Sequence, residues 1–194
     1  MIIGITGGIG GGKTTFSNVL REAGYMVYDS DLEARRLQNG DENIRKQISA
    51  LFGVAAYNEK GLNRGLIADI VFNSPEKLAQ LNTIIHPAVE ADFLKWMKKY
   101  PDEKYYFIES AVLFESHFDS LVDKTILVTA SEEIRIERVM RRDALTKEQV
   151  LQRIKHQLPE EQKIMLSDYV LNTDRNSDLK LYLDEIFETL ADKT

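Results

Sequence analysis

The stretch Gly7-Gly8-Ile9-Gly10-Gly11-Gly12-Lys13-Thr14 fits the phosphate-binding-loop pattern G-x-x-x-x-G-K-[ST] at every position. An apolar run over residues 1–5 precedes it and predicts a buried strand, while residues 15–23 after it predict a helix. The motif binds phosphate in this strand–loop–helix context. The alternative, a glycine-rich turn with a chance lysine, leaves the strand and helix around it unexplained. The sequence therefore predicts a nucleoside triphosphate site.

Each residue type in the loop has a physical role. The glycines let consecutive N–H groups point into one concavity that suits anionic oxygens, and the following helix adds its positive end. We expect Lys13 to reach the terminal phosphates and the Thr14 hydroxyl to ligate Mg²⁺, so Mg²⁺ is the expected cofactor with ATP. The expected ATP-binding residues of this segment are Gly8, Ile9, Gly10, Gly11, Gly12, Lys13, Thr14 and Thr15.

Length and composition exclude several classes of protein. The chain has 194 residues, 43% of them hydrophobic, which predicts one domain with a sizeable core. It has no cysteine and only three scattered histidines, which excludes disulfides, thiol catalysis and cysteine-type zinc sites. No apolar run approaches a membrane span, and the N-terminus lacks the features of a signal peptide. We therefore expect a cytoplasmic protein with no membrane partner, a monomer or weak homo-oligomer.

Charge is unevenly distributed along the chain. The net charge of −6 argues against general nucleic-acid binding. Residues 135–155 hold seven basic and three acidic residues, so this segment is +4 and the remainder is −10. A local basic patch on an acidic protein suits a small, highly charged ligand. The alternative is a solvated helix face.

Strand-like and helix-like segments alternate. Further strands are expected at residues 26–28, ending at Asp29, and at 105–109, 124–128 and 169–171. Helices are expected at 88–99, 132–142, 147–157 and 178–190, and Thr146 and Gln149 predict a capping box for the third of these. This alternation is typical of an α/β doubly wound fold with a mostly parallel five-stranded sheet.

Two helical additions to this fold are expected. Residues 44–99 show helical segments and no obvious strand, and we interpret them as a helical insertion on the substrate side. Residues 143–158, beside the basic cluster, are interpreted as a helical lid. The nucleotide-binding core then comprises residues 1–43 and 100–194.

Carboxylates follow the second expected strand, in Asp29-Ser30-Asp31. A carboxylate at this edge of a parallel sheet would face the phosphate loop. Phosphoryl transfer needs alignment, charge neutralisation and an acceptor for the nucleophile's proton. Asp29 or Asp31 can supply that base or hold Mg²⁺ through water. The alternative is a turn or the N-cap of the next helix.

Arginines are the second group of candidates. A cluster of three shares one broad face of the helix at 132–142, and Arg153 lies on the following helix. Converging guanidinium groups bind phosphate oxygens and stabilise charge in phosphoryl transfer. The alternative is surface ion pairing with Glu137 or Asp143. The three clustered residues are Arg138, Arg141 and Arg142.

His86-Pro87 lies between two helical segments. His86 either contacts substrate or caps and packs a corner at which Pro87 starts the next helix.

In several ordered segments the chain resembles the dephospho-coenzyme A kinase family. The loop departs from the family's Ser-Gly-Lys-Ser ending but keeps the hydroxyl, and Ala111 stands where a proline is usual. The similar segments are Ile3 to Gly10, Asp29-Ser30-Asp31, Leu62-Asn63-Arg64, Ile85-His86-Pro87, Leu113-Phe114-Glu115, Arg138 with Arg142-Asp143, Arg153-Ile154 with Gln157, and Asp168 to Asn172.

The resemblance implies a transferase that moves the γ-phosphoryl group of ATP to the ribose 3′-hydroxyl of dephospho-coenzyme A, the last step of coenzyme A biosynthesis. It implies Asp31 as general base and Asn172 as a contact to adenine. The implied catalytic residues are Asp31, Lys13, Arg138, Arg142 and Arg153. The implied substrate-binding residues are Asp31, Arg64, His86 and Glu115.

Three rival functions remain at this point. Another small-molecule kinase of the same loop type would share the loop and the arginines. A GTP-binding switch would need a guanine-reading Asn-Lys-x-Asp, whereas this chain has Asn172-Thr173-Asp174. A nucleotide-binding protein without catalysis would not need Lys13, Thr14 and Asp31 together.

Overall fold

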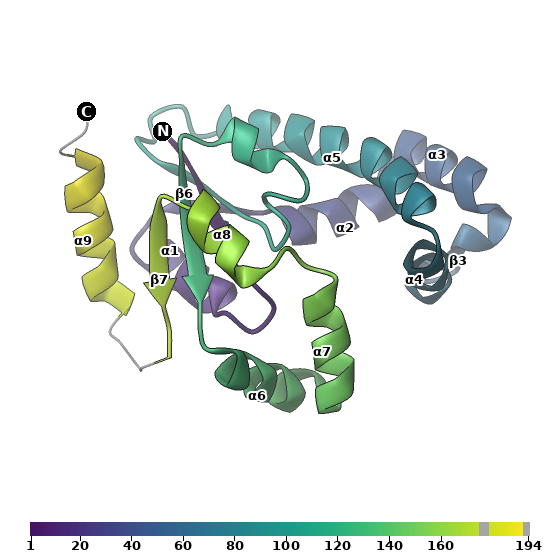
Figure 1. The fold of residues 1–194 in the computed structure, drawn as a ribbon. Helices are drawn as coiled ribbons and strands as arrows, with labels where there is room; N and C mark the ends of the chain where they lie inside the picture. The colour runs from purple at the N-terminus through teal and green to yellow at the C-terminus, as the bar shows by residue number, and fades with distance from the viewer. Residues whose placement is uncertain (175–178, 192–194) are drawn as a thin grey trace. The chain divides into compact units, whose positions relative to one another are not determined.

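A five-stranded parallel sheet organises one of two compact units, which is formed by the chain up to Asp29 and from Asp102 onward (Figure 1). The computed structural model describes residues 1–174 and 179–191. The strand order is β2-β5-β1-β6-β7, and each neighbouring pair is parallel, as expected from the sequence. The strands are β1 (Ile2–Thr6), β2 (Met26–Asp29), β5 (Tyr106–Glu109), β6 (Lys124–Thr129) and β7 (Tyr169–Asn172).

The helices around this sheet largely match the expected ones. The first begins at Lys13, two residues early, and the expected lid helix ends at Lys155, followed by a separate short helix that the pattern did not predict. The capping box at Thr146 and Gln149 is confirmed. Asp178, the expected start of the last helix, lies outside the described residues. The helices are α1 (Lys13–Glu22), the 3₁₀ turn η2 (Phe118–Leu121), α6 (Glu132–Asp143), α7 (Lys147–Lys155), α8 (Glu160–Leu166) and α9 (Leu179–Ala191).

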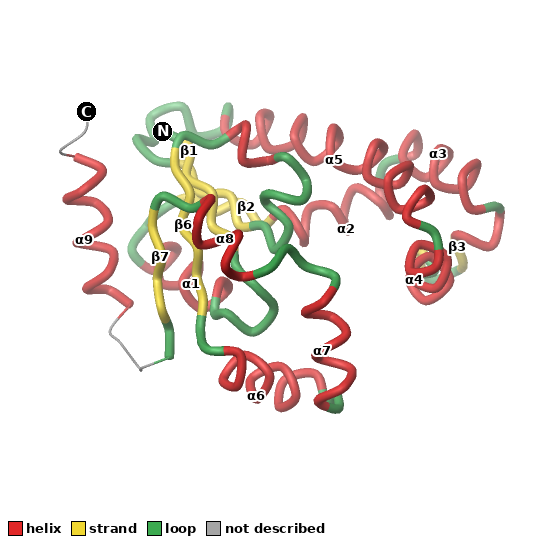
Figure 2. Tube along the Cα trace, in the orientation of Figure 1, coloured by secondary structure: helices red, strands yellow, loops and turns green. Residues whose placement is uncertain are grey.

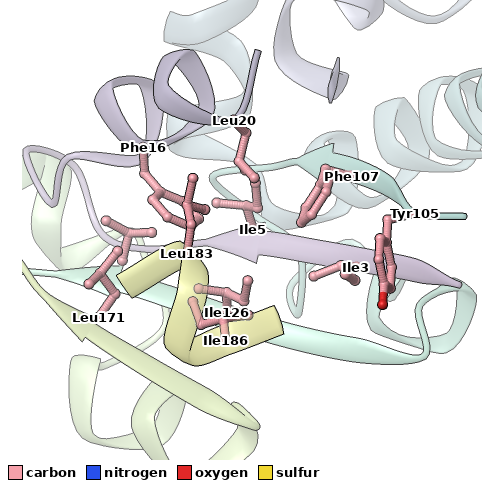
Figure 3. Packing of buried hydrophobic residues seen from close by; sticks show 11 residues of the cluster. Ile3, Ile5, Phe16, Leu20, Tyr105, Phe107, Ile126, Leu171, Leu183 and Ile186 are labelled. Carbon is pink, nitrogen blue, oxygen red and sulfur yellow. The ribbon is translucent and has the colours of Figure 1, made fainter. Parts of the chain in front are cut away.

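One face of the sheet packs against α1 and α9 (Figure 3). Strand side chains alternate between faces, so Ile3 and Ile5 of β1 point together into this core. Phe16 and Leu20 of α1 are fully buried against them. The cluster also contains Phe107, Ile126, Leu171, Leu183 and Ile186. Removing this apolar area from water stabilises the fold and fixes the start of α1 beside β1.

The other face of the sheet is covered by the chain that follows β5. A Cβ atom added to Gly4 of β1 would lie 2.8 Å from a Leu113 methyl carbon, so Leu113 packs directly onto the strand backbone. Figure 1 shows α1 behind the sheet and α8 in front of it. Chain segments on both faces make this a doubly wound α/β fold.

A second compact unit comprises Ser30–Pro101. Figure 2 shows it to be almost entirely helical. The expected insertion, residues 44–99, falls within it, and the internal contacts group the preceding helix with it as well. The sequence shows no obvious strand in this insertion, but the structure contains two antiparallel strands of two residues each. These strands are too short to give an alternating pattern in the sequence. The elements are α2 (Ser30–Gly40), α3 (Glu42–Phe52), η1 (Val54–Ala56), β3 (Tyr57–Asn58), β4 (Gly61–Leu62), α4 (Arg64–Asn73) and α5 (Pro75–Met97).

The expected corner at His86-Pro87 is wrong, because α5 continues through it. Pro87 cannot donate to the carbonyl four residues earlier, which costs a helix interior about 3 kcal/mol. A buried stripe at four-residue spacing offsets that cost and holds the two halves in one helix. Its residues are Leu81, Ile85, Val89 and Phe93. Although α5 has 23 residues, none of the helices in the described ranges is apolar over a stretch long enough to cross a bilayer.

Asp168 fastens β7 to β6 at the start of the edge strand. Its carboxylate accepts hydrogen bonds from the Lys124 ammonium at 2.6 Å and from the Thr125 N–H and hydroxyl, each at 2.9 Å. Its own N–H donates to the Thr125 hydroxyl at 2.9 Å. Burial by itself raises the pKa of Asp168, but the bonds from Lys124 and Thr125 outweigh it and leave the pKa below its ordinary value.

Replacing this carboxylate should destabilise the protein at neutral pH and less so in acid. A lowered folded-state pKa stabilises the fold above the unfolded value near 3.9, and this contribution disappears as the pH falls below it. We expect Asp168→Asn to lower the free energy of unfolding by about 1–3 kcal/mol at pH 7. In urea titrations the difference from the wild type should shrink below about pH 4. A constant difference from pH 7 to pH 3 would contradict this.

Gly10 and Gly24 share a backbone conformation but differ in their surroundings. Their φ angles are +81° and +91°, in the left-handed region that L side chains rarely adopt. A Cβ atom on Gly10 would lie 2.5 Å from the Arg135 carbonyl oxygen, because the loop passes against α6. A Cβ atom on Gly24 would meet no atom of the described residues within 4 Å.

This difference predicts unequal effects of alanine at the two positions. Gly24→Ala should cost about 1–2 kcal/mol of unfolding free energy, the penalty of the left-handed conformation. Gly10→Ala should cost about 1–3 kcal/mol more, since backbone must move to admit the methyl group. Chemical denaturation of both variants measures the comparison. Equal losses would mean that the loop does not press on α6.

Candidate functional site

The phosphate loop and the arginine face of α6 enclose one cavity of about 640 Å³. Four cationic side chains stand around it, so its charge suits a ligand with several phosphate groups. Five of the eight expected loop residues and three of the four candidate arginines therefore meet here. The lining residues are Gly10, Gly12, Lys13, Thr14, Thr15, Arg138, Val139, Arg141 and Arg142.

The loop presents a positive end to this cavity. Gly12, at φ +100°, caps α1 without any side-chain hydrogen bond, and the first turn of α1 holds no acidic residue. The N–H groups at such a helix start favour an anion. The Lys13 ammonium donates to the Gly7 carbonyl at 2.8 Å and the Gly8 carbonyl at 3.4 Å, which holds it across the loop. The segment can thus bind phosphate through both backbone and side chain.

Arg138 is fixed by the chain that follows β7. It donates to the Thr173 hydroxyl and carbonyl, each at 2.8 Å, and to the Gly10 carbonyl at 3.4 Å. The Thr173 hydroxyl in turn lies 3.0 Å from the Gly11 carbonyl. This network places the guanidinium group beside the loop before any ligand contributes a bond.

Arg142 and Arg153 share one counter-ion, Asp143. The Asp143 carboxylate lies 2.7 Å from the Arg142 Nε and 3.2 Å from an Arg153 terminal nitrogen. The hydrogen bonds from Arg142, with the nearby Arg153 charge, hold the pKa of Asp143 below its ordinary value. Arg142 also lines the cavity, whereas Arg153 does not. The ion pair with Asp143, given as the alternative for these arginines, is therefore present.

Glu109 is a site residue that the sequence analysis missed. It ends β5, is only 4% exposed, and accepts a hydrogen bond from the Thr14 hydroxyl at 3.0 Å. Its second carboxylate oxygen accepts no hydrogen bond from the described part of the chain, and the nearest cation is Arg21 at 4.0 Å. The available signal was a carboxylate at the carboxyl end of a buried strand.

These groups fit a magnesium ion that arrives with a nucleotide. Mg²⁺ prefers oxygen ligands and is usually held by one or two protein oxygens together with substrate phosphates. Thr14 offers its hydroxyl oxygen while its proton is directed to Glu109, and the buried second oxygen of Glu109 remains to accept from bound water. Within the described ranges, no three His, Asp or Glu side chains form a separate metal cluster.

A buried ion pair packs against the phosphate loop. Arg135, on α6, is 5% exposed and lies 3.1 Å from Glu160, which also bonds the Thr129 hydroxyl. A Cβ atom on Gly8 would lie 2.2 Å from an Arg135 terminal nitrogen. A charge buried this deeply needs its partner. Nothing in the sequence distinguishes Arg135 from the other arginines of α6, so only the structure identifies it as buried.

Asn172 and Glu115 do not line the cavity. Asn172, at the end of β7, is exposed and accepts a hydrogen bond from the Asp174 N–H at 2.8 Å. Glu115 accepts from the Leu158 N–H at 2.9 Å and lies 3.6 Å from the fully buried Lys163 ammonium. Asp31, Arg64 and His86 belong to the second unit, on α2, α4 and α5.

The chain resembles known proteins over nearly its whole length. The family model "Dephospho-CoA kinase" matches residues 1–178. A dephospho-CoA kinase of Leptospira interrogans is 39% identical over 194 residues, which cover 99% of this chain and 94% of that protein. A solved protein from Thermus thermophilus is 36% identical with a TM-score of 0.87, and the likeness covers 98% of this chain and 97% of that one.

A more distant structure bears on the fold alone. Shikimate kinase from Acinetobacter baumannii, solved with shikimate, is 17% identical and has a TM-score of 0.57, covering 99% of this chain and 94% of that one. This chain thus shares its fold with that protein. Together with the match of the family model over residues 1–178, the relatives establish that this chain belongs to the dephospho-CoA kinase family.

Proposed function

We propose that this chain transfers the γ-phosphoryl group of ATP to the ribose 3′-hydroxyl of dephospho-CoA, with CoA and ADP as products. The observation that carries the proposal is the cavity in which the phosphate loop faces Arg138, Arg141 and Arg142, in a chain of this family. Such an arrangement supplies the alignment and charge neutralisation that phosphoryl transfer requires. The reaction is the last step of coenzyme A biosynthesis, and we place it in the cytoplasm.

The donor would be held by the loop. The N–H groups at the start of α1 and the Lys13 ammonium would bind the β- and γ-phosphate oxygens. Thr14, backed by Glu109, would hold Mg²⁺, which when bound neutralises phosphate charge. Arg138 and Arg142 would stabilise the charge that develops on the transferred group, and Arg153 would join them by leaving Asp143.

Asp31 is proposed as the general base. β2 ends at the same edge of the parallel sheet as β1, from which the phosphate loop leaves, and Asp31 follows two residues after that end. The 3′-oxygen of the acceptor would form a bond to the γ-phosphorus while the bond to the ADP oxygen breaks. The hydroxyl proton would pass to the Asp31 carboxylate.

The other proposed contacts concern the two substrates. Arg64, His86 and Glu115 are proposed for dephospho-CoA, and Asn172 for adenine. Residues 143–158 are proposed as the lid. We further propose that the protein works as a monomer or weak homo-oligomer without a nucleic-acid or membrane partner.

The direct test is ADP release from Mg·ATP with and without dephospho-CoA. We expect rapid release only with this acceptor and CoA as the product. Asp31→Asn should lower turnover by about 10²- to 10⁴-fold, because a general base is lost, while ATP binding stays unchanged. Release that depends instead on a nucleoside or nucleotide would overturn the proposed acceptor. Normal turnover of Asp31→Asn would remove Asp31 from the mechanism.

The role of Glu109 predicts a change in magnesium dependence. Glu109→Gln keeps the side-chain volume and removes the negative charge of the group that accepts the hydrogen bond from the Thr14 hydroxyl. The Mg²⁺ concentration needed for half-maximal tightening of ADP binding should rise about 10- to 100-fold, as for other groups that support metal ligands. ADP binding in EDTA should not weaken. Glu22→Gln, at the exposed end of α1, is the control and should behave as the wild type.

A further inference from the structure

Ile9 of the phosphate loop is held through both its backbone and its side chain. Its N–H donates to the Gln157 side-chain oxygen at 2.8 Å. Its side chain packs against the small apolar cluster that joins the two helices, whose buried members are Ile136, Val139 and Val150. Figure 1 shows α6 and α7 side by side. The side chain of this loop residue is thus held by the helix pair, and its backbone by the chain that follows α7.

Gln157 is held in a segment that is itself firmly attached. α7 ends at Lys155, and residues 157–163 then return to the sheet. The Leu158 N–H and the fully buried Lys163 ammonium both approach Glu115, at 2.9 and 3.6 Å. Glu160 pairs with the buried Arg135. These contacts to Glu115 and to Arg135 of α6 hold the segment beside the phosphate loop, and Gln157, two residues after the end of α7, connects that end of the helix to Ile9.

α7 carries an arginine proposed for the phosphates. Arg153 lies four residues before Gln157, or about one helical turn, and is 53% exposed in its ion pair with Asp143. A displacement of Ile9 when phosphate fills the loop would therefore act on the chain at the end of α7, next to Arg153. The hydrogen bond from the Ile9 N–H to Gln157 is also specific, because a half-buried N–H group without an acceptor costs free energy.

We propose that Gln157 is a positioning residue that couples the phosphate loop to α7. It holds the Ile9 N–H, so that nucleotide binding in the loop orders α7 and its arginine, and an ordered α7 strengthens nucleotide binding in return. Such coupling is reciprocal by thermodynamic necessity. The inference rests on the proposed binding of nucleotide phosphates at the loop.

Amide hydrogen exchange of the whole protein with and without Mg·ADP tests this coupling. In the wild type, ADP should slow exchange both in the loop, at residues 11–14, and in α7. Gln157→Met has similar length but no acceptor. It should bind ADP about 2- to 12-fold more weakly, the range of one net hydrogen bond. At saturating ADP it should keep loop protection and lose the protection of α7.

Gln152→Met is the matched control, because Gln152 is an exposed residue of α7. It should retain the wild-type response. Equal α7 protection in Gln157→Met and wild type would overturn the role of Gln157. A wild type in which ADP protects the loop but not α7 would overturn the coupling and leave the nucleotide site intact. If ADP does not protect the loop of the wild type, the proposed nucleotide site itself is wrong.

Discussion

The close passage of the phosphate loop against backbone is the constraint on which the rest of this structure depends. A Cβ atom at Gly10 would lie 2.5 Å from the Arg135 carbonyl oxygen, and one at Gly11 would lie 2.5 Å from the Val128 carbonyl oxygen. Only glycine fits where main chain meets main chain so closely. This contact sets the loop against both β6 and α6. The arginines of α6 consequently stand around the loop, and the cavity acquires its charge.

Most of the cationic groups at the cavity already have partners within the chain. Lys13 is bonded to loop carbonyls, Arg138 to Thr173, and Arg142 to Asp143. Exposed ion pairs contribute little to stability, so the pair of Arg142 and Asp143 can be exchanged at small cost. The deeply buried pair of Arg135 and Glu160 is different, since separating it would leave an uncompensated charge. The site thus combines a buried ion pair that must stay intact, Arg135 with Glu160, and an exposed arginine, Arg142, that can exchange Asp143 for a phosphate group.

Local patterns predicted the parts of the molecule in which neighbours along the chain decide the outcome. The apolar strands, the loop motif and the Thr146–Gln149 capping box all follow from residues within one or two turns of each other. The prediction at His86-Pro87 is wrong for the opposite reason. Proline favours a helix start locally, but the buried stripe of α5 spans both sides of it. The packing of the whole 23-residue helix therefore outweighs the preference of Pro87 for a helix start.

The sequence by itself determined the fold class, the phosphate loop and the family, because short-range periodicity and contiguous motifs encode them. Only the tertiary structure decided which groups meet at the site. Glu109 reaches Thr14 across 95 residues, and Gln157 reaches Ile9 across 148. Arg135 and Arg138 lie one turn apart on one helix, yet one is a buried support and the other lines the cavity. Burial and pairing between distant segments make that distinction, because they depend on how strands are ordered in the sheet and not on the residues nearby in the chain.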